Sequence, residues 1–260
     1  MSEIITLCTD FGLGDGYVAA MKGVMLSIAP KARLVDISHQ IAPQSVWEGA
    51  FVLRSAYAFF PLGTVHLVVV DPGVGSERRA VAVRVGGHLF VAPDNGVLGY
   101  ILQEEREVEA VSLTNPAYWR EAVSKTFHGR DIFAPVAAHL ARGVPLEDVG
   151  EPLEELVGLD LPVPERQSGS TIIGHVIHID GFGNVVTNIP ASMLQEDARW
   201  KVVAGEKQII DLSSTYASAR RGDPIALIGS HGFLEIAVRE GSAARIAHLT
   251  VGDTVQAIRI

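Results

Sequence analysis

The fold is decided by one stretch, Val65-His66-Leu67-Val68-Val69-Val70-Asp71-Pro72-Gly73-Val74-Gly75-Ser76-Glu77-Arg78-Arg79. Its run of β-branched and apolar residues predicts a strand buried on both faces, as in the middle of a parallel sheet. Open α/β sheets bind ligands at the carboxyl ends of such strands, so Asp71 is a candidate site residue and Arg78 can fold back onto it. Asp71 could equally be a turn aspartate that closes a core strand, with Arg78 on a solvated edge.

The composition bounds the class of protein. The chain has 260 residues, 48% of them hydrophobic and 20% charged, which is typical of a soluble globular protein with one large domain or two small ones. The net charge of −9 argues against nucleic acid as the main partner. The sequence has neither a membrane-length apolar run nor the basic start of a signal peptide, so we expect a cytoplasmic protein without membrane contact. The single cysteine, Cys8, is expected to be inert core.

The residues before the central stretch predict a strand, a glycine-rich loop and a helix. The strand covers Ile4 to Thr9, and the helix covers Tyr17 to Ile28. The loop between them does not fit a dinucleotide fingerprint, because the third glycine would fall at Tyr17. It also carries Asp10 and Asp15 where a phosphate would need donors, so it suits hydroxyls or an ammonium group better.

The residues after the central stretch add two more candidate sites. A hairpin is predicted over residues 80–92, followed by Pro93-Asp94-Asn95-Gly96, a turn signal whose acid and amide could equally line a site. His128 lies just before a helix predicted from about Ile132 to Arg142. That position favours catalysis or anion binding, although a lone loop histidine can also be merely solvated.

The composition changes near Gly158. Residues 159–170 show no periodicity and are interpreted as a linker, and the chain beyond them consists mostly of short strands. We therefore predict an N-terminal α/β domain with a largely parallel central sheet, residues 1–160. A small C-terminal β-barrel or sandwich domain should cover residues 170–260.

Seven motifs, in order, resemble those of one family, the S-adenosylmethionine hydrolases (adenosine-forming) or hydroxide adenosyltransferases, relatives of the fluorinases and chlorinases. The motifs are Thr9-Asp10-Phe11-Gly12, Asp36-Ile37-Ser38-His39, Asp71-Pro72-Gly73-Val74-Gly75, Pro93-Asp94-Asn95-Gly96, Phe127-His128-Gly129-Arg130-Asp131, Gly183-Asn184-Val185-Val186-Thr187-Asn188 and Gly229-Ser230-His231-Gly232-Phe233-Leu234-Glu235. Each motif alone is weak, but the ordered set spans nearly the whole chain and is specific.

The resemblance implies a reaction and three catalytic residues. Water would attack C5′ of the ribose in S-adenosyl-L-methionine, giving adenosine and L-methionine without a metal or other cofactor. The family's Asp-Arg-His set matches Asp71, Arg78 and His128. Asp71 and His128 would orient the water and accept its proton, while Arg78 would fix the carboxylate.

The resemblance also implies contacts with the substrate. These residues are Asp10, Asp15, Asp180, Phe182, Asn184, Ser230, Glu235, Arg239 and Ala243. Asp10 would bind the ribose hydroxyls, and Asp15 and Asp180 would lie near the methionine ammonium. The motif that contains Ser230 and Glu235 would contact the methionine carboxylate through Ser230. The other four would form the adenine site.

Departures from the halogenase branch favour water as the nucleophile. Where the fluorinase pattern has a tyrosine and a threonine in its halide pocket, this sequence has Asp71 and Val74, and a carboxylate repels a halide. The resemblance further implies a homotrimer with active sites at subunit interfaces.

Two other functions remain open from the sequence. One is a non-catalytic sensor of S-adenosylmethionine or adenosine. The other is a metal-dependent hydrolase, although its possible ligands have no recognised metal-binding spacing. These ligands are Asp10, Asp36, His39, Asp71, Asp94 and His128.

Overall fold

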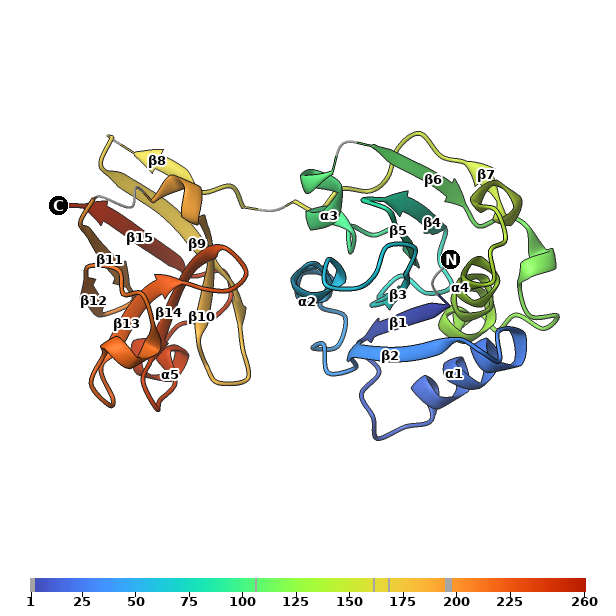
Figure 1. The fold of residues 1–260 in the computed structure, drawn as a ribbon, viewed down its shortest axis with the longest axis horizontal. Coiled ribbons are helices and arrows are strands. Elements are labelled where there is room, and N and C mark those ends of the chain that lie inside the picture. The colour runs from blue at the N-terminus through green and yellow to red at the C-terminus, as the bar shows by residue number, and fades with distance from the viewer. Residues whose placement is uncertain (1–2, 106, 161, 168, 195–197) are drawn as a thin grey trace. The chain divides into compact units, whose positions relative to one another are not determined.

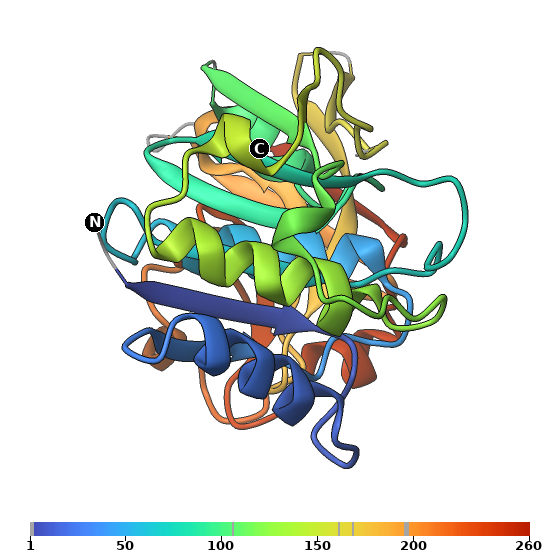
Figure 2. The same ribbon diagram turned by 90° about the vertical axis from the view of Figure 1, so that its right-hand side faces the viewer.

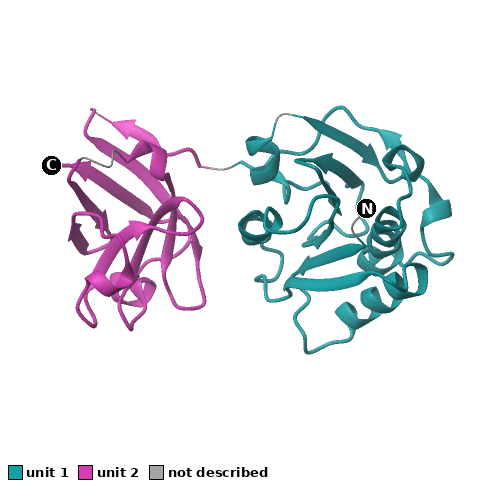
Figure 3. Cartoon of the chain, in the orientation of Figure 1, with its two compact units in different colours: residues 1–160 teal, residues 161–260 magenta. Residues whose placement is uncertain are grey.

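The chain divides into two compact units, residues 1–160 (unit 1) and residues 161–260 (unit 2), drawn in two colours in Figure 3. The structure is a computed structural model and describes residues 3–105, 107–160, 162–167, 169–194 and 198–260. Each unit has its own hydrophobic core. No helix in these ranges is long and apolar enough to cross a membrane.

Unit 1 combines a seven-stranded sheet with helices on both faces (Figure 1). Its strands are β1 (Ile4–Thr9), β2 (Arg33–Ser38), β3 (Val65–Val69), β4 (Ala80–Val85), β5 (His88–Pro93), β6 (Val108–Ser112) and β7 (Glu151–Pro152). Its main helices are α1 (Tyr17–Ile28), α2 (Val46–Tyr57), α3 (Gly99–Glu104), the π-helix η2 (Gly129–Phe133) and α4 (Ala134–Ala141), which continues η2. Two short 3₁₀ helices are η1 (Pro116–Tyr118) and η3 (Leu146–Val149).

The sheet of unit 1 is mixed, so a largely parallel sheet is not confirmed. The strand order is β2-β1-β3-β5-β4-β6-β7, and parallel pairs occur only between neighbours among the first four strands of this order. The pairs that β4 makes with β5 and β6, and the pair of β6 with β7, are antiparallel. The physical reason is the two-residue turn Gly86-Gly87, since a turn this short can join only antiparallel neighbours.

Strand β3 is buried on both faces, as the sequence predicted. Val65, Leu67 and Val69 pack in one core together with residues of α1 and α4. Val68 and Val70 point the opposite way, into a second core that includes residues of α2 and α3. Figure 2 shows α1 and α4 lying over the same face of the sheet. The strand therefore delivers Asp71 from the middle of unit 1.

The strands of this sheet contain buried titratable side chains, among them Cys8 and His66. Burial raises the pKa of the Cys8 thiol to about 12, so this thiol stays protonated at neutral pH. His66 is fully buried, with its Nδ1 2.8 Å from Thr6 Oγ1 and its Nε2 3.2 Å from His88 Nδ1. Burial, helped by the neighbouring His88, lowers the pKa of His66 to about 3.

Unit 2 is an antiparallel, nearly closed barrel of eight strands, with a small helix, α5 (Ala243–Ala247). The amide of Ser213 follows β12 (Lys207–Ile210) and donates to the Ala226 carbonyl of β13 (Pro224–Ile228) at 2.8 Å. This contact brings the two ends of the strand order together. The strands are β8 (Glu165–Gln167), β9 (Thr171–Ile179), β10 (Val185–Pro190), β11 (Trp200–Ala204), β12 (Lys207–Ile210), β13 (Pro224–Ile228), β14 (Phe233–Val238) and β15 (Thr254–Arg259). The 3₁₀ helices are η4 (Ala191–Met193) and η5 (Tyr216–Ser218).

The interpretation of residues 159–170 as a linker is wrong in part. Residues Glu165–Gln167 form β8, which pairs antiparallel with β9, while positions 161 and 168 lie outside the described residues. A strand of three residues is too short to show an alternating pattern in the sequence. It forms because it pairs with β9, which its own residues do not reveal.

Candidate active site

The predicted site residues fall into two groups, one in each unit. The first group is centred on Asp71, which follows β3 with its side chain only 5% exposed. Arg78 Nε donates to Asp71 Oδ1 at 2.9 Å and to Oδ2 at 3.1 Å, and Arg78 Nη2 also binds Oδ2. This fork-to-carboxylate geometry fixes both groups and leaves Asp71 negatively charged beside a permanent cation.

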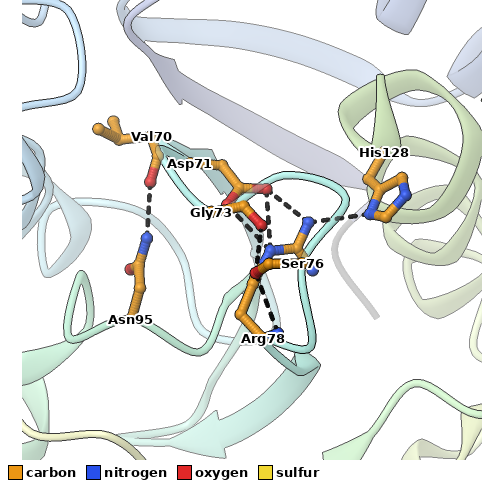
Figure 4. A network of polar contacts seen from close by, with 7 residues as sticks. All are labelled: Val70, Asp71, Gly73, Ser76, Arg78, Asn95 and His128. Carbon is orange, nitrogen blue, oxygen red and sulfur yellow. Dashed lines mark hydrogen bonds and ion pairs between the residues drawn. The ribbon is translucent and has the colours of Figure 1, made fainter. Parts of the chain in front are cut away.

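The loop between Asp71 and Arg78 is tight, and it needs its glycines (Figure 4). Ser76 Oγ donates to the Gly73 carbonyl at 2.7 Å and accepts from the Arg78 amide at 3.3 Å. Gly75 has a φ of +79°, and a Cβ there would come within 2.5 Å of the Lys125 carbonyl oxygen. A side chain at position 75 would therefore force apart the two loops that carry the catalytic candidates.

His128 completes the first group. It precedes η2, and its Nδ1 lies 3.0 Å from Arg78 Nη2 (Figure 4). A guanidinium can only donate, so Nδ1 must accept, and the proton of the neutral imidazole is assigned to Nε2. Burial and the charge of Arg78 lower the pKa of His128 against the opposing charges of Asp71 and Asp131. At neutral pH His128 therefore presents an N–H donor.

Asp131 holds the loop that carries His128, a function that the sequence reasoning missed. Its fully buried carboxylate accepts from Arg130 Nε at 2.7 Å, from the Ser124 amide at 2.9 Å and from Arg120 Nη1 at 3.0 Å. Burial raises the pKa of Asp131, but these hydrogen bonds outweigh it and keep the pKa below its usual range. The available signal was an acid placed three residues after His128 and next to an arginine.

Asp10 lies at the carboxyl end of β1, beside β3. The register pairs Thr9 with Val69, so the residues that follow both strands emerge at one edge of the sheet. Asp10 Oδ2 accepts from the Gln44 amide at 2.8 Å. Asp15, in contrast, is exposed farther along the same loop.

The second group lies in unit 2, around a cavity of about 680 Å³. Asp180 organises it: Oδ1 accepts from the amides of Phe182 and Asn184 at 2.9 Å each, and Oδ2 accepts from Asn184 Nδ2 at 2.9 Å. Phe182 and Arg239 line the same cavity, and Phe182 is 83% exposed. The structure thus brings together four of the predicted substrate contacts.

Tyr216 also lines this cavity and was not predicted. Its hydroxyl donates to Glu235 Oε1 at 2.6 Å, and burial together with this bond raises the pKa of Tyr216 to about 12. Glu235 is buried, and its Oε2 lies 3.1 Å from His231 Nε2. The carboxylate is thus held in place and fixes the hydroxyl of Tyr216. Ser230 is exposed in the β13–β14 turn, and Ala243 is buried at the start of α5.

Of the other acids and histidines considered as metal ligands, Asp36 and His39 contact each other, with His39 Nε2 3.0 Å from Asp36 Oδ1. Lys22 Nζ donates to Asp36 Oδ2 at 2.6 Å, and His39 Nδ1 lies 2.8 Å from Thr9 Oγ1. Asp94 is paired with Arg79. Within the described ranges, no cluster of three or more His, Cys, Asp or Glu side chains is arranged to hold a metal ion.

Comparisons with known proteins cover both units. A family model described as the SAM hydroxide adenosyltransferase N-terminal domain matches residues 5–150, and the model of the corresponding C-terminal domain matches residues 174–256. The (R)-S-adenosyl-L-methionine hydrolase of Salinispora tropica is 41% identical over 97% of this chain and 96% of that protein. The hydrolase of the same name from Thermus thermophilus is 38% identical over 95% of this chain and 96% of that protein.

Two further relatives mark the breadth of the similarity. A fluorinase from an Actinoplanes species is 32% identical over 98% of this chain and 97% of that protein. The crystal structure of an uncharacterized conserved protein from Thermotoga maritima superposes with a TM-score of 0.92 at 39% identity, covering 98% of this chain and all of that one.

Proposed function

The chain belongs to the SAM hydroxide adenosyltransferase family, and we propose that it hydrolyses S-adenosyl-L-methionine to adenosine and L-methionine. The observation that carries the proposal is the contact of Arg78 with both Asp71 and His128 at the carboxyl edge of the sheet. Together these side chains offer a charged acceptor and a neutral donor to one water molecule.

The reaction depends on positioning the attacking water molecule rather than on protonating the leaving group with a strong acid. An oxygen–carbon bond forms at ribose C5′ as the carbon–sulfur bond breaks, and the electron pair leaves on sulfur as the neutral thioether of methionine. Asp71 accepts a hydrogen bond from the attacking water and receives its proton, while the Nε2–H of His128 orients the water oxygen. Arg78 keeps both groups in place and stabilises the developing hydroxide.

The remaining predicted residues each bind a different part of the substrate. Asp10 binds the ribose hydroxyls, and the cavity of unit 2 takes the adenine, with Phe182 stacking on the base and Asn184 reading its edge. Asp15 and Asp180 attract the ammonium group. In line with the family resemblance, Ser230 contacts the methionine carboxylate, and Arg239 and Ala243 contact the adenine. Glu235 acts indirectly, through its hydrogen bond with Tyr216.

The proposal includes three properties of the whole enzyme. It needs no metal or other cofactor, since a sulfonium is already a good leaving group. It is a cytoplasmic protein. It assembles as a homotrimer in which one subunit contributes the catalytic triad of a site and another contributes the adenine contacts.

Hydrolysis in ¹⁸O-water tests the proposed reaction. The label should enter the 5′-hydroxyl of adenosine, because oxygen attacks carbon, and methionine should stay unlabelled. Mass spectrometry of both products measures this. Homocysteine, methylthioadenosine or unlabelled adenosine as the main product would refute the mechanism.

Two further measurements, activity after chelation and calorimetric binding, separate the proposed enzyme from the two rival functions. A metal-dependent hydrolase would lose activity after exhaustive chelation, whereas the proposed enzyme keeps it. A sensor would bind S-adenosylmethionine in calorimetry and leave it intact over hours.

A further inference from the structure

Asn95 holds the amino end of the loop that carries the ion pair. Its Nδ2 donates to the Val70 carbonyl at 2.9 Å, and Val70 is the residue immediately before Asp71 (Figure 4). Its Oδ1 accepts from the Val97 amide at 3.2 Å, so the side chain is fixed at both of its polar atoms. The bond reaches from the turn after β5 to the end of β3, two strands that are already neighbours.

Asp94 holds the other end of the same loop. Its Oδ2 accepts from Arg79 Nε at 2.7 Å, and its amide donates to the Arg79 carbonyl at 3.0 Å. Arg79 is the residue immediately after Arg78. The Asp94 side chain is 3% exposed, and its Oδ1 accepts from the Val157 amide at 2.8 Å, so this anchor is buried and fully engaged.

We propose that Asp94 and Asn95 are positioning residues that clamp the loop at residues 70 and 79 and thereby set the geometry of Asp71 and Arg78. The two clamp points directly flank the two members of the ion pair, so a shift at either point moves a reacting group. The restraints inside the loop, through Ser76, fix its shape but do not tie it to the sheet. This inference deepens the proposed function and rests on it.

A turn that only supported the fold would behave differently. It would contribute to the free energy of unfolding without affecting the contact of Arg78 with His128. The chain offers a matched comparison in Asn115, whose Oδ1 accepts from the Ala117 amide at 3.1 Å and whose Nδ2 donates to the Asp148 carbonyl at 2.7 Å. Asn115 therefore makes the same two bonds as Asn95 at a place without catalytic neighbours.

The test compares Asn95→Asp with Asn115→Asp in the full-length protein. Each change keeps the acceptor and removes the donor without changing the size of the side chain. We expect Asn95→Asp to lower kcat about ten-fold with little change in KM, since misplacement of reacting groups by a fraction of an ångström costs rate rather than binding. Asn115→Asp should keep the wild-type kcat. Asp94→Asn should likewise lower kcat. Its control is Glu109→Gln, which weakens the exposed Arg84–Glu109 ion pair and should keep the wild-type kcat.

A second readout needs no substrate. NMR titration of the histidine ring signals should show the pKa of His128 rising in Asn95→Asp, because a displaced Arg78 lowers it less, and unchanged in Asn115→Asp. Equal kcat values and equal His128 titrations in the two asparagine variants would overturn the inference. If the wild-type protein left S-adenosylmethionine intact, the proposed function would fail, and the titration would still decide whether the clamp positions Arg78.

Discussion

At the scale of single residues, the site depends on one guanidinium that serves two partners. Arg78 binds Asp71 through two nitrogens and His128 through one of them, and its guanidinium carbon lies 5.2 Å from the centre of the Phe133 ring. Lysine could not make these contacts together, because it presents a point charge rather than a planar fork. The sequence identified all three residues of this contact, although only the family resemblance set them above ordinary turn and loop residues.

The carboxylate of Asp71 should be essential for turnover. Asp71→Asn is expected to lower kcat by roughly 10²-fold or more, the usual scale of a lost acid–base contribution, while substrate binding survives. Asp211→Asn is the matched control, since Asp211 binds Arg199 through the same fork at 2.9 to 3.1 Å but is exposed in unit 2. Kinetics of both variants and calorimetric binding measure the effect. Wild-type turnover in Asp71→Asn would refute its assigned function.

The protonation of His128 should set the acidic limit of activity. Its Nδ1 must be free of a proton to accept from Arg78, and burial together with Arg78 lowers its pKa below the ordinary 6.5. We therefore expect kcat/KM to stay level as pH falls from neutral through 6.5 and to decline only in more acidic solution. A pH–rate profile measures this, and a decline centred at or above 6.5 would contradict the assignment.

At the scale of elements, the strongly patterned segments could be predicted and the irregular ones could not. Strand β1 and helix α1 have the predicted bounds, because an apolar run marks the strand and a helical spacing marks the helix. The π-helix η2 and helix α5 carry no such pattern, since five residues are too few to show one. The contact of Tyr216 with Glu235 joins residues 19 positions apart, and only the barrel brings them together.

The buried side chain of His66, in β3, should make the free energy of unfolding sensitive to acid. In the unfolded chain His66 has a pKa near 6.5, whereas the folded pKa is about 3. Below pH 6.5 the unfolded state therefore binds a proton that the folded state excludes. The free energy of unfolding should fall by up to about 1.4 kcal/mol per pH unit down to the folded pKa.

Urea denaturation at about pH 7 and about pH 5 checks this dependence. His66→Gln, which does not titrate, should show a smaller loss of stability between the two conditions than the wild type. His248→Gln, a change at an exposed histidine of unit 2, should leave the loss as it is. Equal losses in the wild type and His66→Gln would show that another group is responsible.

At the scale of the whole molecule, the proposed trimer makes a prediction about mixed subunits. Analytical ultracentrifugation should give three times the chain mass of 27.8 kDa. Asp71→Asn and Phe182→Ala are each expected to be nearly inactive, and subunits of the two refolded together should regain activity. Random mixing pairs an intact triad with an intact adenine cavity in about a quarter of the sites. A mixture no more active than its components would exclude shared sites.

The buried thiol of Cys8 makes the protein convenient to label. With a pKa of about 12 and no exposed surface, this thiol will not react with maleimides at neutral pH. Two cysteines introduced at exposed positions, one in each unit, would then be the reactive thiols of the chain. Fluorescent dyes attached in this way, one on each unit, would let single-molecule energy transfer follow the enzyme during turnover without first removing a native cysteine.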